Sequence, residues 1–171
     1  MKTVVVYESM WGNTAHLARA VAKGMGDVPL MDVAHTSATD LEGVGFIVLG
    51  GPTHAFSMSR LTTRGDAHRQ GAHHGTAGRG IRELIHELPD PLSARVATFD
   101  SRVAKVRHLP GSAARAAAMQ LRRQHAAQVV DVQNFYVEDM EGPLLPGELA
   151  RALAWGAELA AHNGIASSRP A

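Results

Sequence analysis

The sequence has 171 residues, 45% of them hydrophobic, and a formal net charge of +1, which predicts one globular domain with a substantial core. It contains no cysteine, which excludes disulfides, thiolate nucleophiles and iron–sulfur ligation, so any redox chemistry requires a bound cofactor. The balanced charge argues against a nucleic-acid-binding face, and no apolar run approaches the ~20 residues that span a bilayer.

The two ends of the chain give further expectations. Met1-Lys2-Thr3 leads directly into an apolar run, a pattern unlike that of a signal peptide, so we expect a cytoplasmic protein. Residues 1–165 are expected to form one domain without an internal linker. Residues 166–171 are short, polar and terminal, which predicts a disordered tail.

Five apolar runs predict β-strands, and helical patterns lie between most of them. The predicted strands are Thr3–Tyr7, Val28–Val33, Gly45–Gly50, Arg95–Phe99 and Val129–Val137. Apolar residues repeat at helical spacing from Leu17 to Met25 and from Ile81 to Leu88, and Ser112 is placed to cap a third helix that runs to about His125. Between the second and third strands there is room only for a short turn around Thr39 to Leu41.

The last predicted helix is opened by Pro146. Its apolar stripe is expected to consist of Leu149, Ala152, Leu153, Gly156, Leu159 and Ala160. Strands that are apolar throughout and alternate with amphipathic helices indicate a parallel sheet that is buried on both faces. The sequence therefore predicts an α/β protein, a three-layer α/β/α sandwich around a five-stranded parallel sheet.

The first predicted strand runs into the polar loop Ser9-Met10-Trp11-Gly12-Asn13-Thr14, directly before a helix. Its hydroxyl and amide side chains, the close approach that Gly12 permits and the free N–H groups of the helix all favour an anion. A simple helix N-cap would need only one of these polar residues. The P-loop motif GxxxxGK[ST] and the dinucleotide motif GxGxxG are both absent, which leaves a single terminal phosphate as the best fit.

This loop resembles the phosphate loop of flavodoxins, and its spelling is similar to that of flavodoxin domains fused in larger flavoproteins. The resemblance implies a flavodoxin-like fold with strand order 2-1-3-4-5 and one non-covalently bound FMN. It further implies that the residues from Ser9 to Thr14 hold the phosphate. In such sheets, ligands bind beyond the carboxyl ends of the strands, at the point where the strand order reverses.

A second segment, Leu49-Gly50-Gly51-Pro52-Thr53-His54-Ala55-Phe56, follows the third predicted strand. It resembles the flavodoxin segment that lies against the isoalloxazine ring, where a backbone group faces flavin N5. The resemblance implies that one side of the ring contacts Pro52, Thr53, His54, Ala55 and Phe56. A generic turn at a strand end also fits Gly-Gly-Pro-Thr, but the two motifs support each other because they would end neighbouring strands.

The third expected segment follows the fourth strand and begins with Asp100, Ser101 and Arg102, which we place on another side of the ring. The tyrosine and acidic residues that flavodoxins usually have here are not obvious, so stacking would fall to Phe56, Trp11 or His54. Two outcomes are open for Arg102 and Lys105: they stay in solvent, as such residues usually do, or one of them approaches the ring. If either cation approached the ring, it would favour the anionic reduced form.

The segment from Ser57 to Arg79 is long and basic, with a short polar helix expected between Ser59 and Gln70. A solvated excursion and a role in gating or in binding an anionic partner are both open, because loops beyond ~12 to 15 residues are commonly functional or disordered. His68, His73 and His74 raise the question of zinc, but their spacing matches no closed site and no cysteine completes one.

The resulting hypothesis is an FMN-binding redox protein that moves electrons or hydride. Its partners would be a redox protein, or NAD(P)H and a small electron acceptor as in a quinone reductase, with no nucleic acid and no membrane. Diffusing flavodoxins are typically acidic, which this chain is not. The alternative is a flavodoxin-like scaffold that has lost FMN and binds another protein. Oligomeric state stays open.

Overall fold

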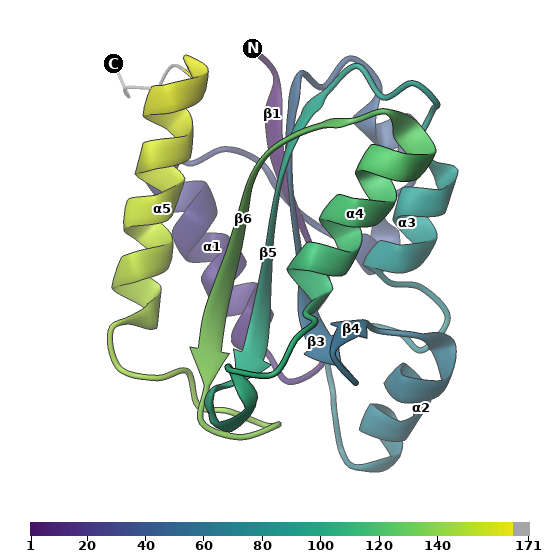
Figure 1. The fold of residues 1–171 in the computed structure, drawn as a ribbon, viewed down its shortest axis with the longest axis vertical. Helices are drawn as coiled ribbons and strands as arrows, with labels where there is room; N and C mark the ends of the chain where they lie inside the picture. The colour runs from purple at the N-terminus through teal and green to yellow at the C-terminus, as the bar shows by residue number, and fades with distance from the viewer. Residues whose placement is uncertain (166–171) are drawn as a thin grey trace.

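A computed structural model describes residues 1–165, so the predicted tail at 166–171 lies outside the described residues. The central sheet contains β1 (Thr3–Tyr7), β2 (Leu30–Asp32), β3 (Phe46–His54), β5 (Arg95–Val103) and β6 (Gln128–Val137) (Figure 1). These strands are parallel and lie in the order β2-β1-β3-β5-β6. Counted along the chain, this is the predicted order 2-1-3-4-5. The short strand β4 (Ser57–Met58) pairs antiparallel with the end of β3 and was not predicted.

Helices cover both faces of the sheet, which confirms the three-layer prediction (Figure 1). Helices α1 (Asn13–Gly24) and α5 (Glu148–Asn163) pack on one face. Helices α3 (Ile81–Glu87) and α4 (Ala113–His125) pack on the other, and α2 (Leu61–Arg69) lies at the edge where the parallel strands end. Single-turn helices follow at η1 (Val33–His35), η2 (Ala38–Leu41) and η3 (Ala104–Val106).

Alternate residues of the buried strands supply two hydrophobic cores. Val4 and Val6 of β1 pack toward α3 and α4, whereas Val5 packs toward α1 and α5. On the α1 and α5 side, Phe99, Phe135 and Trp155 meet edge to face with ring centroids 5.9–6.0 Å apart. These cores fix the sheet edge from which the loops emerge.

Strands β3 and β5 are longer than predicted, which changes the environment of the loops that follow them. Backbone pairing continues past Gly50 and Phe99 as far as Pro52 and Ser101, although the side chains there are small or polar. The Phe99 ring lies against Gly50 here, so a Cβ on Gly50 would lie 2.0 Å from it. Backbone hydrogen bonding therefore extends the sheet where the apolar pattern ends.

The predicted apolar stripe of α5 is wrong at two positions. Leu149 and Leu153 are 48% and 40% exposed, whereas Trp155, which the stripe omitted, is buried together with Ala152 and Leu159. The reason is the close contact between α5 and α1, where a Cβ on Gly156 would lie 2.3 Å from the Val21 carbonyl oxygen. Within residues 1–165, no helix combines the length and the apolar character needed to cross a membrane.

Candidate functional site

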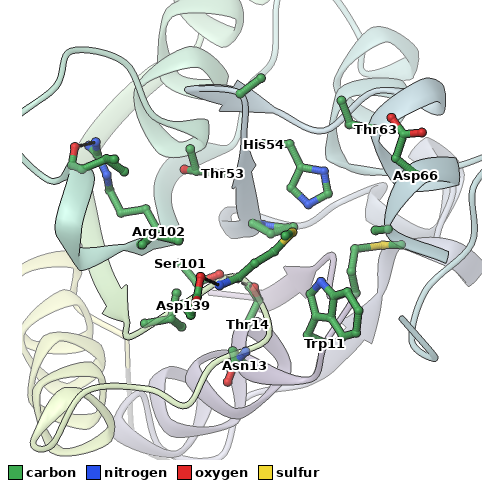
Figure 2. Close-up of a pocket in the computed structure, with 18 of the residues that line it drawn as sticks. Trp11, Asn13, Thr14, Thr53, His54, Thr63, Asp66, Ser101, Arg102 and Asp139 are labelled. Carbon is green, nitrogen blue, oxygen red and sulfur yellow. Dashed lines mark hydrogen bonds between the residues drawn. The ribbon is translucent and has the colours of Figure 1, made fainter. Parts of the chain in front are cut away.

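A cavity of about 450 Å³ opens at the carboxyl ends of β1, β3 and β5 (Figure 2). The chain leaves β1 toward β2 on one side and returns to β3 on the other, so this is where the strand order reverses. Its volume lies in the range of small-molecule and cofactor sites. Among the predicted residues, those that line it are Met10, Trp11, Asn13, Thr14, Pro52, Thr53, His54, Ala55, Phe56, Ser101 and Arg102; Ser9, Gly12 and Asp100 do not.

The backbone of the Ser9–Thr14 loop has the geometry of an anion site. Gly12 caps α1 with φ +90°, a conformation that favours glycine, and its N–H donates to the Ser9 hydroxyl at 3.1 Å. In the described part of the chain, the N–H groups of Trp11, Asn13 and Thr14 donate to no protein acceptor. Free N–H groups at the first turn of a 12-residue helix are a suitable cradle for a phosphate.

The side-chain donors of this loop are partly engaged by neighbouring loops. The Thr14 hydroxyl lies 2.8 Å from the Ser101 hydroxyl (Figure 2). The Asn13 amide donates to the Glu141 carbonyl at 3.0 Å. Ser9 is only 2% exposed. The backbone of this loop therefore offers more free donors to an anion than the side chains of Ser9, Asn13 and Thr14 do.

The second predicted segment forms a tight β3–β4 hairpin. His54 pairs with Ser57, and the two residues between them, Ala55 and Phe56, have φ values of 47° and 62°. Positive φ at both central positions is the type I′ arrangement, in which Asn-Gly is preferred and other residues are strained by roughly 1–2 kcal/mol each. The hairpin places Phe56, which is 45% exposed, at the wall of the cavity.

His54 lies on the same side of the cavity as Trp11, Thr63 and Asp66 (Figure 2). Burial lowers the pKa of the His54 imidazole below its ordinary value, and the positive charge of Arg64 acts in the same direction. The side chain is thus a neutral imidazole near pH 7, able to donate one hydrogen bond and accept another.

The third predicted segment divides into two parts. Ser101 and Arg102 line the cavity, but Asp100 is fully buried behind it and accepts hydrogen bonds from the Ala114 N–H and the Asn134 amide, both at 2.9 Å. Burial raises the pKa of the Asp100 carboxyl. Asp100 lies on β5, and by accepting from the Ala114 N–H it holds the first turn of α4 in place; its contact with a ligand stays a prediction.

Arg102 is only 3% exposed, so the alternative that it stays in solvent is wrong. The guanidinium donates to the carbonyl oxygens of Val106 and Leu109, at 2.9 and 3.2 Å, and thereby fixes the loop after β5. Lys105 is exposed. Val103 and Val106 supply apolar surface to this part of the cavity wall.

Helix α2 contributes cavity residues that the sequence did not identify, namely Thr63, Asp66, Ala67 and Gln70. The short helix itself was predicted, but its contact with the Ser9–Thr14 loop was not. Val137, Asp139 and Met140, at the end of β6 and just after it, were missed for the same reason: they come together with the cavity only in three dimensions.

A buried network holds α2 in this position. Arg64 is fully buried and donates to the Ser59 hydroxyl at 2.8 Å, while its other terminal nitrogen lies 3.0 Å from a Glu83 carboxylate oxygen. Ser59 in turn donates to Glu8, at the end of β1. Burial raises the pKa of the Glu8 carboxyl, although its hydrogen bonds from Ser59 and Ile81 oppose that shift.

The arginines of the Ser57–Arg79 segment are therefore largely occupied. Arg79 forms an ion pair with Glu87 and donates to the Thr36 carbonyl, and Arg69 pairs with Asp66. Arg64 is buried as well, so most arginines of this segment are not free to bind an anionic partner. In the described ranges, no three His, Asp or Glu side chains converge as a metal site would require.

Solved structures with the same architecture are flavodoxins and flavodoxin-like proteins. Oxidised flavodoxin 1 from Bacillus cereus is 20% identical, with a TM-score of 0.66 and coverage of 95% of this chain and 99% of that one. A flavodoxin from the domain Archaea is 19% identical, with a TM-score of 0.62 and coverage of 95% and 98%. A flavodoxin, WrbA-like protein from Agrobacterium tumefaciens is 20% identical, with a TM-score of 0.60 and coverage of 96% and 98%.

These likenesses extend over nearly the whole chain, which has the flavodoxin-like fold. No protein-family model matches the sequence, and no curated protein matches it at the sequence level.

Proposed function

We propose that this chain binds one FMN non-covalently in the cavity and moves electrons or hydride through it. The observation that carries the proposal is the cavity itself, which has a helix N-terminus with free N–H groups at one end and the hairpin with Phe56 at the other. A cofactor with an anionic tail and a flat apolar ring fits both ends. The similar solved structures include an oxidised flavodoxin, which agrees with this choice.

Each loop has a distinct task in this proposal. The N–H groups of Trp11, Asn13 and Thr14 would hold the phosphate, while Phe56, His54 and Trp11 offer aromatic faces to the ring. Val103 and Val106 exclude water from the opposite side. The bound flavin supplies the redox chemistry, and the protein supplies its position, its dry surroundings and the local charge.

FMN titration tests the proposal. The purified protein should turn yellow with FMN and quench its fluorescence at one equivalent. The Gly12→Ala variant should bind FMN at least tenfold more weakly, because Gly12 has φ +90° and an added Cβ would lie 3.2 Å from the His74 ring. Gly43→Ala is the matched control, since Gly43 also has a positive φ, of +70°, but lies outside the cavity and has open space around it. A protein that stays colourless with excess FMN contradicts the proposal and favours a scaffold that binds another protein.

A second candidate function, an NAD(P)H-dependent reductase of quinones, is favoured by the polar wall that α2 adds. Thr63, Asp66 and Gln70 extend the cavity beyond the segments that suit FMN, which gives a small acceptor polar partners near His54. Oxidation of NADPH by the FMN-loaded protein with a quinone separates the two roles. Turnover indicates a reductase, and its absence indicates a carrier that exchanges electrons with a redox protein. Either role is compatible with the cytoplasmic location that we include in the proposal.

A further inference from the structure

The segment from Ser101 to Val130 contains no acidic residue. It holds six of the chain's 17 Lys and Arg residues and none of its 16 Asp and Glu residues, although the net charge of the whole chain is only +1. The segment comprises the end of β5, the loop after it, α4 and the start of β6. Apart from the buried Arg102, its cations are exposed, and they are Lys105, Arg107, Arg115, Arg122 and Arg123. Positive charge is therefore concentrated on one part of the surface.

The protein itself does not neutralise these five exposed cations. In residues 1–165, no carboxylate lies within 4.0 Å of any of them. Glu83 and Glu87 of the neighbouring helix α3 are engaged elsewhere, because their carboxylates pair with arginines outside the segment. An acidic group from another molecule would meet no competing carboxylate here.

Four exposed side chains form one stripe along α4. Arg115, Met119, Arg122 and Arg123 follow one another at positions i, i+4, i+7 and i+8, which is the spacing of one helix face. The stripe is roughly 12 Å long at a rise of 1.5 Å per residue. Helix α4 covers the face of the sheet opposite to α1 and α5 (Figure 1), and these four side chains do not line the cavity. The α4 stripe is thus a surface separate from the proposed FMN site.

The stability of the helix explains only part of this arrangement. Arg122 and Arg123 lie in the last turn of α4, where cations interact favourably with the helix dipole. Arg115 lies in the first turn, where the dipole disfavours a cation and where α4 has no acidic residue. The charge at this end of the stripe therefore does not serve the helix.

Apolar side chains lie among the charges. Met119 is 49% exposed in the middle of the α4 stripe, and Leu109, in the loop just before α4, is also 49% exposed. Arg and Met are enriched in protein–protein interfaces. A nucleic acid would gain nothing from the two apolar side chains, and the net charge of +1 is far from that of a typical nucleic-acid-binding domain.

We propose that the α4 stripe, together with the loop residues Lys105, Arg107 and Leu109, is a docking surface for a protein with an acidic surface. Carboxylates of the partner would pair with the arginines, whose guanidinium groups suit bidentate contacts, while an apolar side chain packs on Met119. A surface dominated by exposed charges suits a complex that forms fast and dissociates readily. The inference goes beyond the proposed function and needs no FMN, so a chain that fails to bind FMN leaves it intact.

Binding of a synthetic acidic peptide tests the proposal. The probe is a fluorescein-labelled peptide that is rich in Glu and has Leu at every fourth position, and fluorescence anisotropy measures its binding. The native chain should bind it at 50 mM NaCl and at least fivefold more weakly at 200 mM, because salt screens exposed charges. The Arg115→Gln/Arg122→Gln/Arg123→Gln variant should bind at least tenfold more weakly than the native chain. A native chain that does not bind the peptide at 50 mM NaCl contradicts the proposal.

A matched variant separates the α4 stripe from the net charge. Lys2→Gln/Arg19→Gln/Lys23→Gln also removes three exposed cations, but from the N-terminus and α1 instead of α4. It should bind the peptide within twofold of the native affinity. Equal losses in the two triple variants would mean that only the net charge matters, and the proposal would be wrong.

Met119→Gln distinguishes a protein partner from a nucleic acid. It should weaken binding of the peptide at least threefold through the lost apolar contact, and leave binding of a short DNA duplex unchanged. Tighter binding of the duplex than of the peptide, lost in the arginine variant, would make the stripe a nucleic-acid site and overturn the proposal. The exposed Met119 also provides an answer if the arginine variant does not fold: native affinity for the peptide in Met119→Gln would then count against docking on this stripe.

Discussion

The burial of His54 affects both the stability of the fold and the chemistry of the cavity. The residue lines the cavity, and both its burial and the charge of Arg64 lower the pKa of its imidazole. The His54 imidazole therefore binds a proton less readily in the folded protein than in the unfolded chain, where its pKa is near the ordinary value of 6.5. In the proposed complex with FMN, the same property would let the ring pack against the flavin as a neutral, flat surface.

This difference predicts a stability that decreases with acid. Below pH 6.5 the unfolded chain binds more protons at His54 than the folded one, so the free energy of unfolding falls as the pH decreases toward the folded pKa. The His54→Gln variant should show a shallower decrease between pH 7 and 5.5, by at most about 1.4 kcal/mol per pH unit. Urea denaturation at several pH values measures it. His108→Gln, an exposed control on the loop after β5, should follow the native curve.

Among the elements, the β3–β4 hairpin combines strain with exposure to the cavity. Ala55 and Phe56 occupy left-handed positions where Asn-Gly would be relaxed. Strained backbone of this kind is common at binding sites. The hairpin keeps an aromatic ring at the cavity wall at the expense of local stability.

Relaxing this turn should separate stability from binding. The Ala55→Asn/Phe56→Gly variant should gain about 1–2 kcal/mol in the free energy of unfolding, because the relief of strain at both positions exceeds the conformational entropy that the new glycine loses on folding. It should also bind FMN about tenfold more weakly, since an aromatic contact contributes about 0.5–1.5 kcal/mol beyond its buried area. Chemical denaturation and FMN titration give the two quantities. Ala55→Asn alone keeps Phe56 and should gain stability with native affinity, whereas unchanged affinity in the double variant would exclude Phe56 from the binding surface.

The contact between α1 and α5 depends on glycine in both helices. A Cβ on Gly24 would lie 2.1 Å from the Leu153 carbonyl oxygen, and one on Gly156 would lie 2.3 Å from that of Val21. Neither neighbour is a flexible side chain, so the helices would have to separate.

Gly156→Ala should therefore destabilise the protein by about 2 kcal/mol, because overpacking against backbone outweighs the gain of up to about 1 kcal/mol in helix propensity. Gly65→Ala in α2 is the matched control: this helical glycine has only the end of the Arg69 side chain nearby, at 3.6 Å, and its replacement should stabilise. Thermal unfolding of both variants measures the contrast. A stabilised Gly156→Ala would show that α5 moves away from α1 without loss.

For the molecule as a whole, the sequence predicted the layers and the strand order because alternating apolar elements leave few arrangements of a parallel sheet. It also indicated the loops after β1 and β3, where glycines and polar residues interrupt that pattern. It could not predict that α2 closes the cavity, because Ser59 and Arg64 meet Glu8 and Glu83, which are distant in the chain, only after folding. The burial of Arg102 could not be predicted either, because its acceptors are backbone carbonyls, which leave no pattern in the sequence.

The stability of the whole chain should depend on the phosphate of its ligand. At a free concentration of one hundred times its dissociation constant, FMN should stabilise the fold by about 2.7 kcal/mol. For a chain of this length, that free energy raises the Tm by roughly 5–10 °C. Riboflavin has the same ring but no phosphate, so at equal concentration it should give a much smaller shift. The anion site would then account for the difference, because the free N–H groups of Trp11, Asn13 and Thr14 have no other acceptor in the described structure.

Calorimetric scans with FMN, riboflavin and inorganic phosphate distinguish the two ends of the cavity. If the phosphate loop acts as proposed, Gly12→Ala should bring the FMN shift down to the riboflavin shift and leave the riboflavin shift itself unchanged. Gly43→Ala should keep the native difference between the two ligands. Equal shifts for FMN and riboflavin in the native chain would mean that the ring alone determines binding. The free donors at the start of α1 would then have no part in holding the ligand.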